Sequence, residues 1–298
     1  MYHEVVKELL DFMKESGKSQ QQIAKESALS TSVISQFLNQ SYKGNNEEVA
    51  RTVLQYLDMA RLQNIKAKYS CFYEGMHNTR AVLFACHYAH RHGDISLIFG
   101  DAGAGKTTAL KHYTEEHPGV VMVTANSCTS SAASILQMIG SRTGRPLPGK
   151  KEAMMSDLVE YFKDTGRLVI IDEADHLTMS ALQAVRNLND QAGVGVILSG
   201  NTKIYTQLLQ GPKCSELQQL RQRIVVRRMV RNEYGLEEFK AIFPDVPEDC
   251  LPYLIKMAND ESLRATVKIL ELAYEFADTD NISKKILQQV RMQLTGGL

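Results

Sequence analysis

Residues 95–113 read "ISLIFGDAGAGKTTALKHY" and combine three patterns in a row. The apolar residues Ile95, Leu97, Ile98 and Phe99 are typical of a buried strand. The next eight residues, Gly100 to Thr107, fit the phosphate-loop pattern G-x-x-x-x-G-K-[ST]. A helical pattern follows at once, so the loop lies between a strand and a helix, which is the context that the motif requires. The stretch predicts an α/β fold in which a parallel sheet is flanked by helices.

The residue types of this loop suit the triphosphate of ATP. Glycines let backbone N–H groups surround a phosphate without Cβ clashes, and the following helix points its positive N-terminus at the anion. We expect Lys106 to reach the β- and γ-phosphates and the Thr107 hydroxyl to ligate Mg²⁺. The predicted nucleotide contacts from the loop are Gly100, Asp101, Ala102, Gly103, Ala104, Gly105, Lys106, Thr107 and Thr108.

A second motif supplies acidic groups. In "RLVIIDEADHL" (167–177), a four-residue apolar strand ends in Asp172 and Glu173. An acidic pair at the end of a buried strand is costly unless a cation lies beside it. We expect Asp172 to hold Mg²⁺ through water and Glu173 to orient and polarise the attacking water. Together, the two motifs predict hydrolysis of ATP and not binding alone.

Three further side chains are candidates for the same site. Asn201 ends the strand pattern "GVGVILSGN", where an amide would lie on the γ-phosphate side of the sheet; Ser199 competes for this role. Segment 213–231 has six Lys or Arg and one Glu, and its Arg223 suits an arginine finger aimed at a neighbouring subunit's ATP. A solvated basic face is the alternative for that segment. Arg264, early in a helix of the C-terminal region, could reach the phosphates from a helical lid.

The N-terminal part resembles a helix-turn-helix. Ser19 and Gln22 form the pattern of a capping box, "SALS" is the turn, and the second helix begins near Thr31. Ala28 occupies the turn position that usually holds Gly. The second helix would expose groups able to bond phosphates and base edges: Thr31, Ser32, Ser35, Gln36 and Asn39. Residues 20–40 hold one Lys and one Glu, so this part alone should bind DNA weakly, and protein docking remains an alternative.

A second candidate for DNA contact is "SRTGRPLPGKK" (141–151), which has four cations and no acid. Its Gly and Pro residues predict a loop after an apolar helix. The candidate residues are Arg142, Arg145, Lys150 and Lys151.

Composition sets limits on the function. The 298 residues hold 34 Lys+Arg and 34 Asp+Glu, so net charge gives no argument for nucleic acid and only local clustering can. The five cysteines are scattered without a C-x-x-C, as expected for reduced thiols in a cytoplasm, and they offer no metal site. No run approaches the ~18 apolar residues of a membrane span.

Three domains are predicted: a helix-turn-helix domain at 1–65, a nucleotide-binding α/β subdomain at 66–230 and a helical lid at 231–298. The lid assignment rests on 3.6-residue periodicity after residue 234, and the linker is placed within "RLQNIKAKYSCFYEG" (61–75), where the helix pattern changes to mixed composition.

The order of these parts resembles an AAA+ ATPase, and the added helix-turn-helix narrows the resemblance. Over nearly its full length the chain is similar to the B proteins of Mu-like transposable phages, a family of ATP-dependent target-DNA activators. "ALSTSVISQFLN" and "GDAGAGKT…LVIIDEADHL…ILSGN" carry the resemblance. It implies ATP and Mg²⁺ as cofactors and an ATP-driven filament on double-stranded DNA with little sequence preference. It also implies a transposase as partner, to which the filament delivers target DNA and which stimulates hydrolysis.

The resemblance assigns the roles given above to Lys106, Thr107, Asp172, Glu173, Asn201, Arg223 and Arg264. Two other functions remain open at this point. A helicase-loader or insertion-sequence helper ATPase would share the motor but use the N-terminal module for docking. An ATP-gated transcription regulator would bind a specific operator as a dimer, and the uncharged recognition face disfavours it.

Overall fold

The computed structural model describes residues 2–69, 72–145, 147, 149–210, 217–277 and 282–295. The chain divides into two compact units. One is formed by Met1–Cys71 with the short piece Tyr274–Asp278, and the other by Phe72–Ala273 and Thr279–Leu298.

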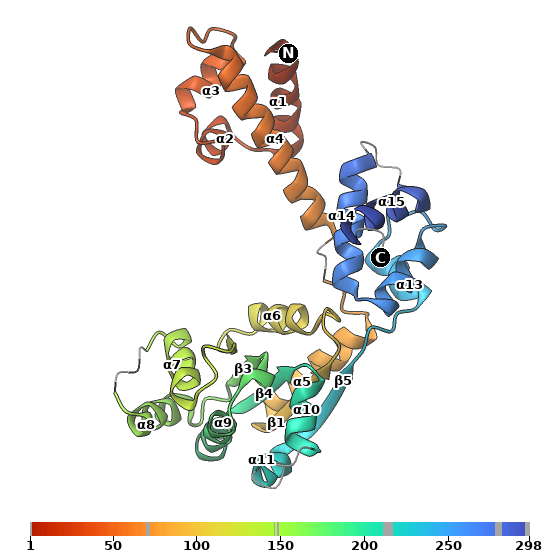
Figure 1. Ribbon diagram of the computed structural model, residues 1–298. Helices are drawn as coiled ribbons and strands as arrows, with labels where there is room; N and C mark the ends of the chain where they lie inside the picture. Colours follow the sequence, from red (N-terminus) through yellow and green to blue (C-terminus); the bar gives the residue numbers. More distant parts are fainter. Residues whose placement is uncertain are drawn as a thin grey trace. The chain divides into compact units, whose positions relative to one another are not determined.

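The N-terminal unit contains the predicted helix-turn-helix. Its helices are α1 (Tyr2–Ser16), α2 (Gln20–Glu26), α3 (Thr31–Leu38) and α4 (Asn46–Tyr69) (Figure 1). The capping box is confirmed, since the Gln22 N–H donates to Ser19 Oγ while the Ser19 N–H donates to Gln22 Oε1. The turn between α2 and α3 places Ala28 at φ 57°, a left-handed conformation that costs a non-glycine residue about 1 kcal/mol. The predicted start of the second motif helix at Thr31 is confirmed.

A small apolar core holds these helices together. Ile23, Ile34, Phe37 and Leu57 are each fully buried in it, with Val5, Val6, Leu9, Val49 and Val53 around them. The predicted linker range, 61–75, contains the end of α4 at Tyr69 and the division between the two units after residue 71. Residues such as Leu, Gln, Lys and Ala have high helix propensity, so the helix continues without the apolar pattern that sequence reading requires.

The second unit is built on a five-stranded parallel sheet with strand order β2-β3-β4-β1-β5, which confirms the predicted fold. The strands are β1 (Ile95–Gly100), β2 (Val121–Thr124), β3 (Leu168–Asp172), β4 (Gly195–Gly200) and β5 (Ile224–Val230). The helices before and between them are α5 (His77–His92), α6 (Lys106–Glu116), α7 (Ala132–Arg142), α8 (Lys151–Phe162), α9 (Met179–Ala192), α10 (Thr202–Leu209) and α11 (Gln218–Arg223), with the short 3₁₀ helix η1 (Ala174–His176) after β3.

Helices cover both faces of this sheet. Alternate strand residues point to opposite faces. Ile98, Ile170 and Ile197 pack with α5 and α6. Leu97, Ile171 and Leu198 pack with α7 to α10 on the other face. Because β1 and β3 are buried on both faces, their residues are almost all apolar, and this made them recognisable in the sequence.

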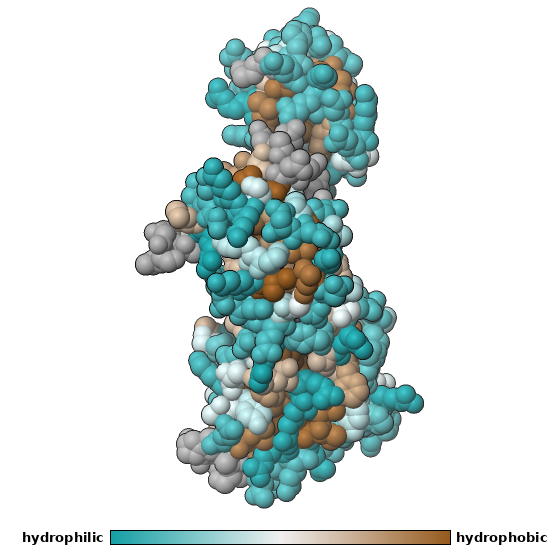
Figure 2. Space-filling model, turned by 90° about the vertical axis from the view of Figure 1, so that its right-hand side faces the viewer, coloured by the Kyte–Doolittle hydropathy of each residue, from teal (hydrophilic) through white to brown (hydrophobic). Residues whose placement is uncertain are grey.

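The C-terminal region is helical, as predicted. It contains α12 (Leu236–Ile242), α13 (Leu251–Asp260), α14 (Leu263–Ala277) and α15 (Lys284–Thr295), with Phe239, Leu254 and Leu287 among its buried side chains. The face shown in Figure 2 is mainly hydrophilic, with hydrophobic residues in small separate patches. Among the described residues, none of the helices combines the length and the apolar character needed to cross a bilayer.

Candidate nucleotide site and DNA-contact surfaces

The loop after β1 has the backbone that a phosphate cradle needs. Gly100, Gly103 and Gly105 have φ angles of 136°, 74° and 91°, in the region that disfavours other residues. A Cβ on Gly100 would lie 1.9 Å from the Val230 carbonyl oxygen, and one on Gly103 would lie 2.8 Å from Ser262 Cβ. Glycine is therefore required at both positions for space as well as for conformation.

Lys106 begins α6 and turns back over the loop. Its Nζ donates to the Gly100 oxygen at 3.0 Å and to the Asp101 oxygen at 2.7 Å. Burial lowers the pKa of Lys106, and the carboxylates of Glu173 and Asp172 offset part of this effect. The ammonium group is thus held in a partly desolvated loop, next to the acidic ends of the neighbouring strands.

Asp172 is fixed by two hydroxyl groups. It ends β3 and is only 1% exposed. Thr107 Oγ1 donates to its Oδ2 at 2.7 Å, and Ser199 Oγ, from β4, donates to its Oδ1 at 2.8 Å. Thr107 and Asp172 therefore present two neighbouring oxygens, the ligand type that Mg²⁺ prefers, beside a phosphate loop. The residues present fit both ATP and Mg²⁺.

Asn201 lies beside the acidic segment that follows Asp172. Its backbone N–H donates to Asp175 Oδ1 at 3.1 Å and its Nδ2 donates to Asp175 Oδ2 at 2.7 Å. Its Oδ1 accepts from the Lys203 N–H and caps α10. Glu173, at φ 54°, precedes η1. The structure therefore brings Asn201 to the Glu173–Asp175 turn, while Ser199, the competing candidate, positions Asp172.

The lid approaches the loop at two places. The start of α14 packs on Gly103, where an added Cβ would lie 3.3 Å from Arg264 Cβ. Asn232, which sequence reasoning missed, lies between the sheet and the lid. Its N–H donates to Asp101 Oδ2 at 2.9 Å, and its Nδ2 donates to the Ala102 oxygen at 3.2 Å and the Glu261 oxygen at 3.4 Å. Asn232 thus connects the phosphate loop to the helical lid.

Arg223, the predicted finger, is the last residue of α11. Its Nε lies 2.8 Å from Asp190 Oδ1 on α9 of the same chain, and its side chain is 59% exposed. Arg221, two residues earlier, is half-buried. The guanidinium of Arg223 is therefore accessible but paired within its own subunit.

All but one of the candidate DNA contacts are exposed. On α3, Thr31, Ser32 and Gln36 are exposed and Ser35 is half-buried. In the basic segment, Arg142, Arg145, Lys150 and Lys151 are all exposed, and Arg145 Cζ lies 5.0 Å from the centroid of the Tyr161 ring.

The predicted loop after an apolar helix is confirmed with narrower bounds, because α7 ends at Arg142 and α8 begins at Lys151. The helices extend into this basic segment because Arg and Lys are good helix formers. Pro146 and Pro148 lie outside the described residues.

The fold and site define an ATPase of the AAA class. A family profile described as "AAA domain" matches residues 89–208, which implies binding and hydrolysis of ATP. Two solved structures share the fold. A chain of the Drosophila ORC bound to DNA has a TM-score of 0.55 and 12% identity, covering 78% of this chain and 66% of its own. A Walker-type ATPase of Pyrococcus abyssi has a TM-score of 0.51 and 14% identity, covering 76% and 74%.

Relatives in sequence are more specific. The chain is 30% identical over 222 residues to "ATP-dependent target DNA activator B" of Escherichia phage Mu, covering 74% of this chain and 70% of that protein. It is 29% identical over 208 residues to "Mu-like prophage FluMu DNA transposition protein B" of Haemophilus influenzae, covering 70% and 72%. The chain belongs to this family of Mu-type transposition B proteins.

Proposed function

We propose that this chain is an ATP-dependent target-DNA activator of transposition. It binds ATP and Mg²⁺, assembles as an oligomer or filament on double-stranded DNA with little sequence preference, and presents that DNA to a transposase. The observation that carries the nucleotide chemistry is the contact of Thr107 with Asp172 beside the phosphate loop. The link to transposition is supported by the family of the chain, because its phage Mu member is named for target-DNA activation.

Each role falls to a residue of the site. Lys106 turns from the loop carbonyls to donate to the phosphates, while Thr107 and Asp172 hold Mg²⁺. Bound Mg²⁺ neutralises charge on the phosphates. Glu173 orients the attacking water and accepts its proton. Asn201 holds the turn that carries Glu173, through Asp175, and Arg264 approaches the phosphates from the lid.

Tight binding to DNA depends on the number of subunits that assemble on it. For contact with DNA a single chain offers the four cations of segment 141–151 and the uncharged face of α3, so its own affinity is low. When subunits assemble side by side on one DNA molecule, each further subunit–DNA contact becomes intramolecular. The affinity of the assembly for DNA therefore rises although no subunit gains a new contact. A chain with no net charge can in this way bind DNA tightly when ATP is present.

The test compares ATP turnover with and without double-stranded DNA in the wild type and in Glu173→Gln. We expect DNA to stimulate the wild type. Glu173→Gln should keep ATP and DNA binding but slow turnover ~10²-fold or more, because water activation is lost and metal binding is not. Glu160→Gln, an exposed residue of α8, is the control of equal charge change. Wild-type turnover in Glu173→Gln would reject the role of Glu173 in water activation. If DNA changes the ATP turnover of no variant, the proposed function as a target-DNA activator is rejected.

A further inference from the structure

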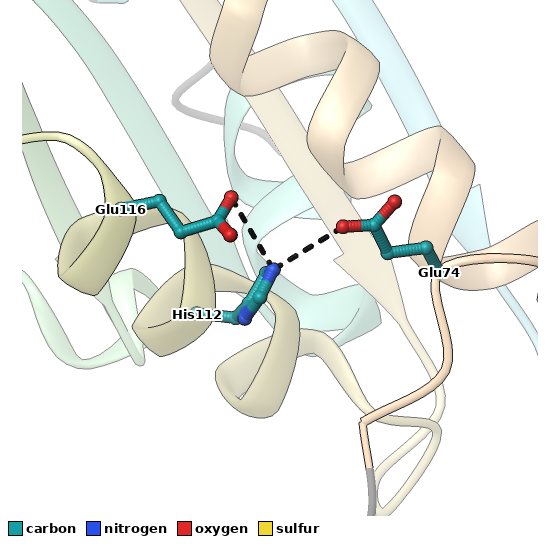
Figure 3. A group of neighbouring side chains, drawn as sticks. All are labelled: Glu74, His112 and Glu116. Carbon is teal, nitrogen blue, oxygen red and sulfur yellow. Dashed lines mark ion pairs between the residues drawn. The ribbon is translucent and has the colours of Figure 1, made fainter.

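Three ligand-type side chains point toward one another beside α6 (Figure 3). His112 and Glu116 lie one turn apart on α6, and Glu74 comes from the segment before α5. His112 Nε2 is 3.4 Å from Glu74 Oε1 and 3.4 Å from Glu116 Oε2. One ligand atom of each residue lies within 4.8 Å of the other two. The three side chains therefore converge on one point from two separate segments.

The imidazole is held in place but left without a hydrogen bond at this point. Phe72 stacks on the His112 ring, with centroids 3.8 Å apart and an interplanar angle of 27°. His112 Nε2 is shielded from solvent, yet none of the described residues hydrogen-bonds to it. A buried polar atom without a partner calls for an explanation. A ligand placed between the nitrogen and the two carboxylates would supply the missing partner.

Charge and access select the kind of ligand. Two carboxylates and a neutral imidazole carry two negative charges, which a divalent cation would balance. The Glu74 and Glu116 side chains are 67% and 55% exposed, so an ion can enter from solvent. Imidazole with carboxylates is a ligand set for Zn²⁺ and similar transition-metal ions, whereas Mg²⁺ and Ca²⁺ prefer oxygen alone.

We propose that Glu74, His112 and Glu116 bind one divalent transition-metal ion of the Zn²⁺ class, with water completing its coordination. The ion ties the segment that directly follows the N-terminal 71 residues to α6. Because α6 begins with Lys106 and Thr107, the metal fastens that segment to the helix of the nucleotide site. The alternative is a protonated His112 that forms ion pairs with both glutamates and binds no metal.

The experiment titrates full-length protein, freed of metal by a chelator and without nucleotide, with Zn²⁺ against a chromophoric competitor. His112→Ala and Glu116→Gln are the test variants. Glu115→Gln is the matched control, because it removes the same charge from the neighbouring exposed position of α6. A second group, Glu173, Asp175 and His176, could take up an ion of its own. The variant His176→Ala shows which equivalent of Zn²⁺ belongs to this second group.

We expect one equivalent of Zn²⁺ to be lost in His112→Ala and kept in His176→Ala. Glu116→Gln should weaken this equivalent ~10-fold or more, while Glu115→Gln matches the wild type. Co²⁺ in place of Zn²⁺ should give a visible absorption band that disappears with His112→Ala. Circular dichroism checks that each variant is folded, and the exposed Glu116→Gln keeps the test valid if His112→Ala is not. Equal Zn²⁺ stoichiometry and affinity in the wild type and Glu116→Gln would leave only the ion pair and overturn the proposal.

Discussion

The Thr107 hydroxyl donates a hydrogen bond of 2.7 Å to Asp172, so the phosphate-loop helix is joined to the end of β3 at the point where the two sequence motifs meet. Ser199 holds the other carboxylate oxygen from β4. Because both oxygens of the Asp172 carboxylate accept hydrogen bonds, its orientation is fixed before a cation binds. Preorganisation of this kind lowers the cost of binding and catalysis.

Ser199→Ala should therefore damage the site more than its small size suggests. It leaves one oxygen of a buried carboxylate unpaired, which should lower the free energy of unfolding by ~1–3 kcal/mol. Loss of orientation should reduce Mg²⁺-dependent ATP turnover ~10-fold or more. Ser96→Ala is the control: Ser96 is equally buried, one strand away, but its hydroxyl has no hydrogen-bond partner among the described residues. Equal turnover in the two variants would show that Ser199 does not position Asp172.

Asn232 offers a test of communication between loop and lid. Asn232→Ala removes its side-chain bonds to the Ala102 and Glu261 oxygens, so we expect ATP affinity to fall ~10-fold. Asn259→Ala is the comparison, because Asn259 bonds the backbone of Tyr234 and not the loop. It should lower stability to a similar extent but leave ATP affinity unchanged. Isothermal titration and thermal unfolding separate the two effects; equal ATP affinity for both variants would contradict the coupling.

The buried ammonium of Lys106 predicts a pH dependence of ATP binding. Because burial lowers the pKa of Lys106, its charge is lost at a lower pH than that of a surface lysine. Above the lowered pKa, ATP affinity should fall ~10-fold per pH unit. In Lys106→Arg the charge persists, so affinity should be weaker but nearly flat with pH.

Loss of folded protein would not explain this fall in ATP affinity at high pH. Between the lowered pKa and the ordinary pKa of a lysine, the unfolded chain binds more protons than the folded chain, so the contribution of Lys106 to stability rises with pH. Binding titrations from about pH 7 to 10 check the prediction. A pH profile of the wild type as flat as that of Lys106→Arg would exclude Lys106 as the titrating group.

The sequence was most informative where function restricts residue types. The glycines, Lys106 and Thr107 fit one pattern, and the apolar strands β1 and β3 are unambiguous because both sheet faces are buried. It did not reveal α5, whose several histidines and small residues weaken the helical pattern, or the four-residue edge strand β2. Partners across the fold were also missed: Ser199 with Asp172, Asn232 with the loop, and Arg223 with Asp190. These pairs depend on which strands and helices become neighbours, and no local pattern encodes that.

The two candidate DNA surfaces can be separated by truncation. Since α4 continues to Tyr69 and the two compact units divide after residue 71, the cut is placed after residue 71. Residues 72–298 should retain detectable ATP-dependent DNA binding, because the basic segment around Arg142 and Lys150 remains. In the full chain, four substitutions by Ala, at Arg142, Arg145, Lys150 and Lys151, should weaken DNA binding more than the truncation does. They should also reduce the salt dependence of DNA binding. Complete loss of DNA binding in a truncated protein that still folds and binds ATP would assign the affinity to α3.

Arg223 provides the last prediction, which concerns assembly. Its contact with Asp190 is an exposed ion pair, and such pairs contribute only ~0–1 kcal/mol. The guanidinium can therefore leave Asp190 at little cost and donate to the γ-phosphate held by a neighbouring subunit, where the charge-assisted bonds are stronger. Such a contact would exist only while the γ-phosphate is present, so we expect ATP to favour the interface and hydrolysis to weaken it.

Arg223→Ala should bind ATP nearly as the wild type does, as a monomer. It should form no ATP-dependent oligomers on DNA and lose DNA-stimulated hydrolysis. Asp190→Asn should have the opposite effect on assembly, because it weakens the competing pair within the subunit and leaves Arg223 available. Sizing and electron microscopy with DNA and a slowly hydrolysed ATP analogue measure both outcomes. Normal filaments from Arg223→Ala would reject the finger role, and failure of Arg221→Ala in the same assay would transfer that role to Arg221.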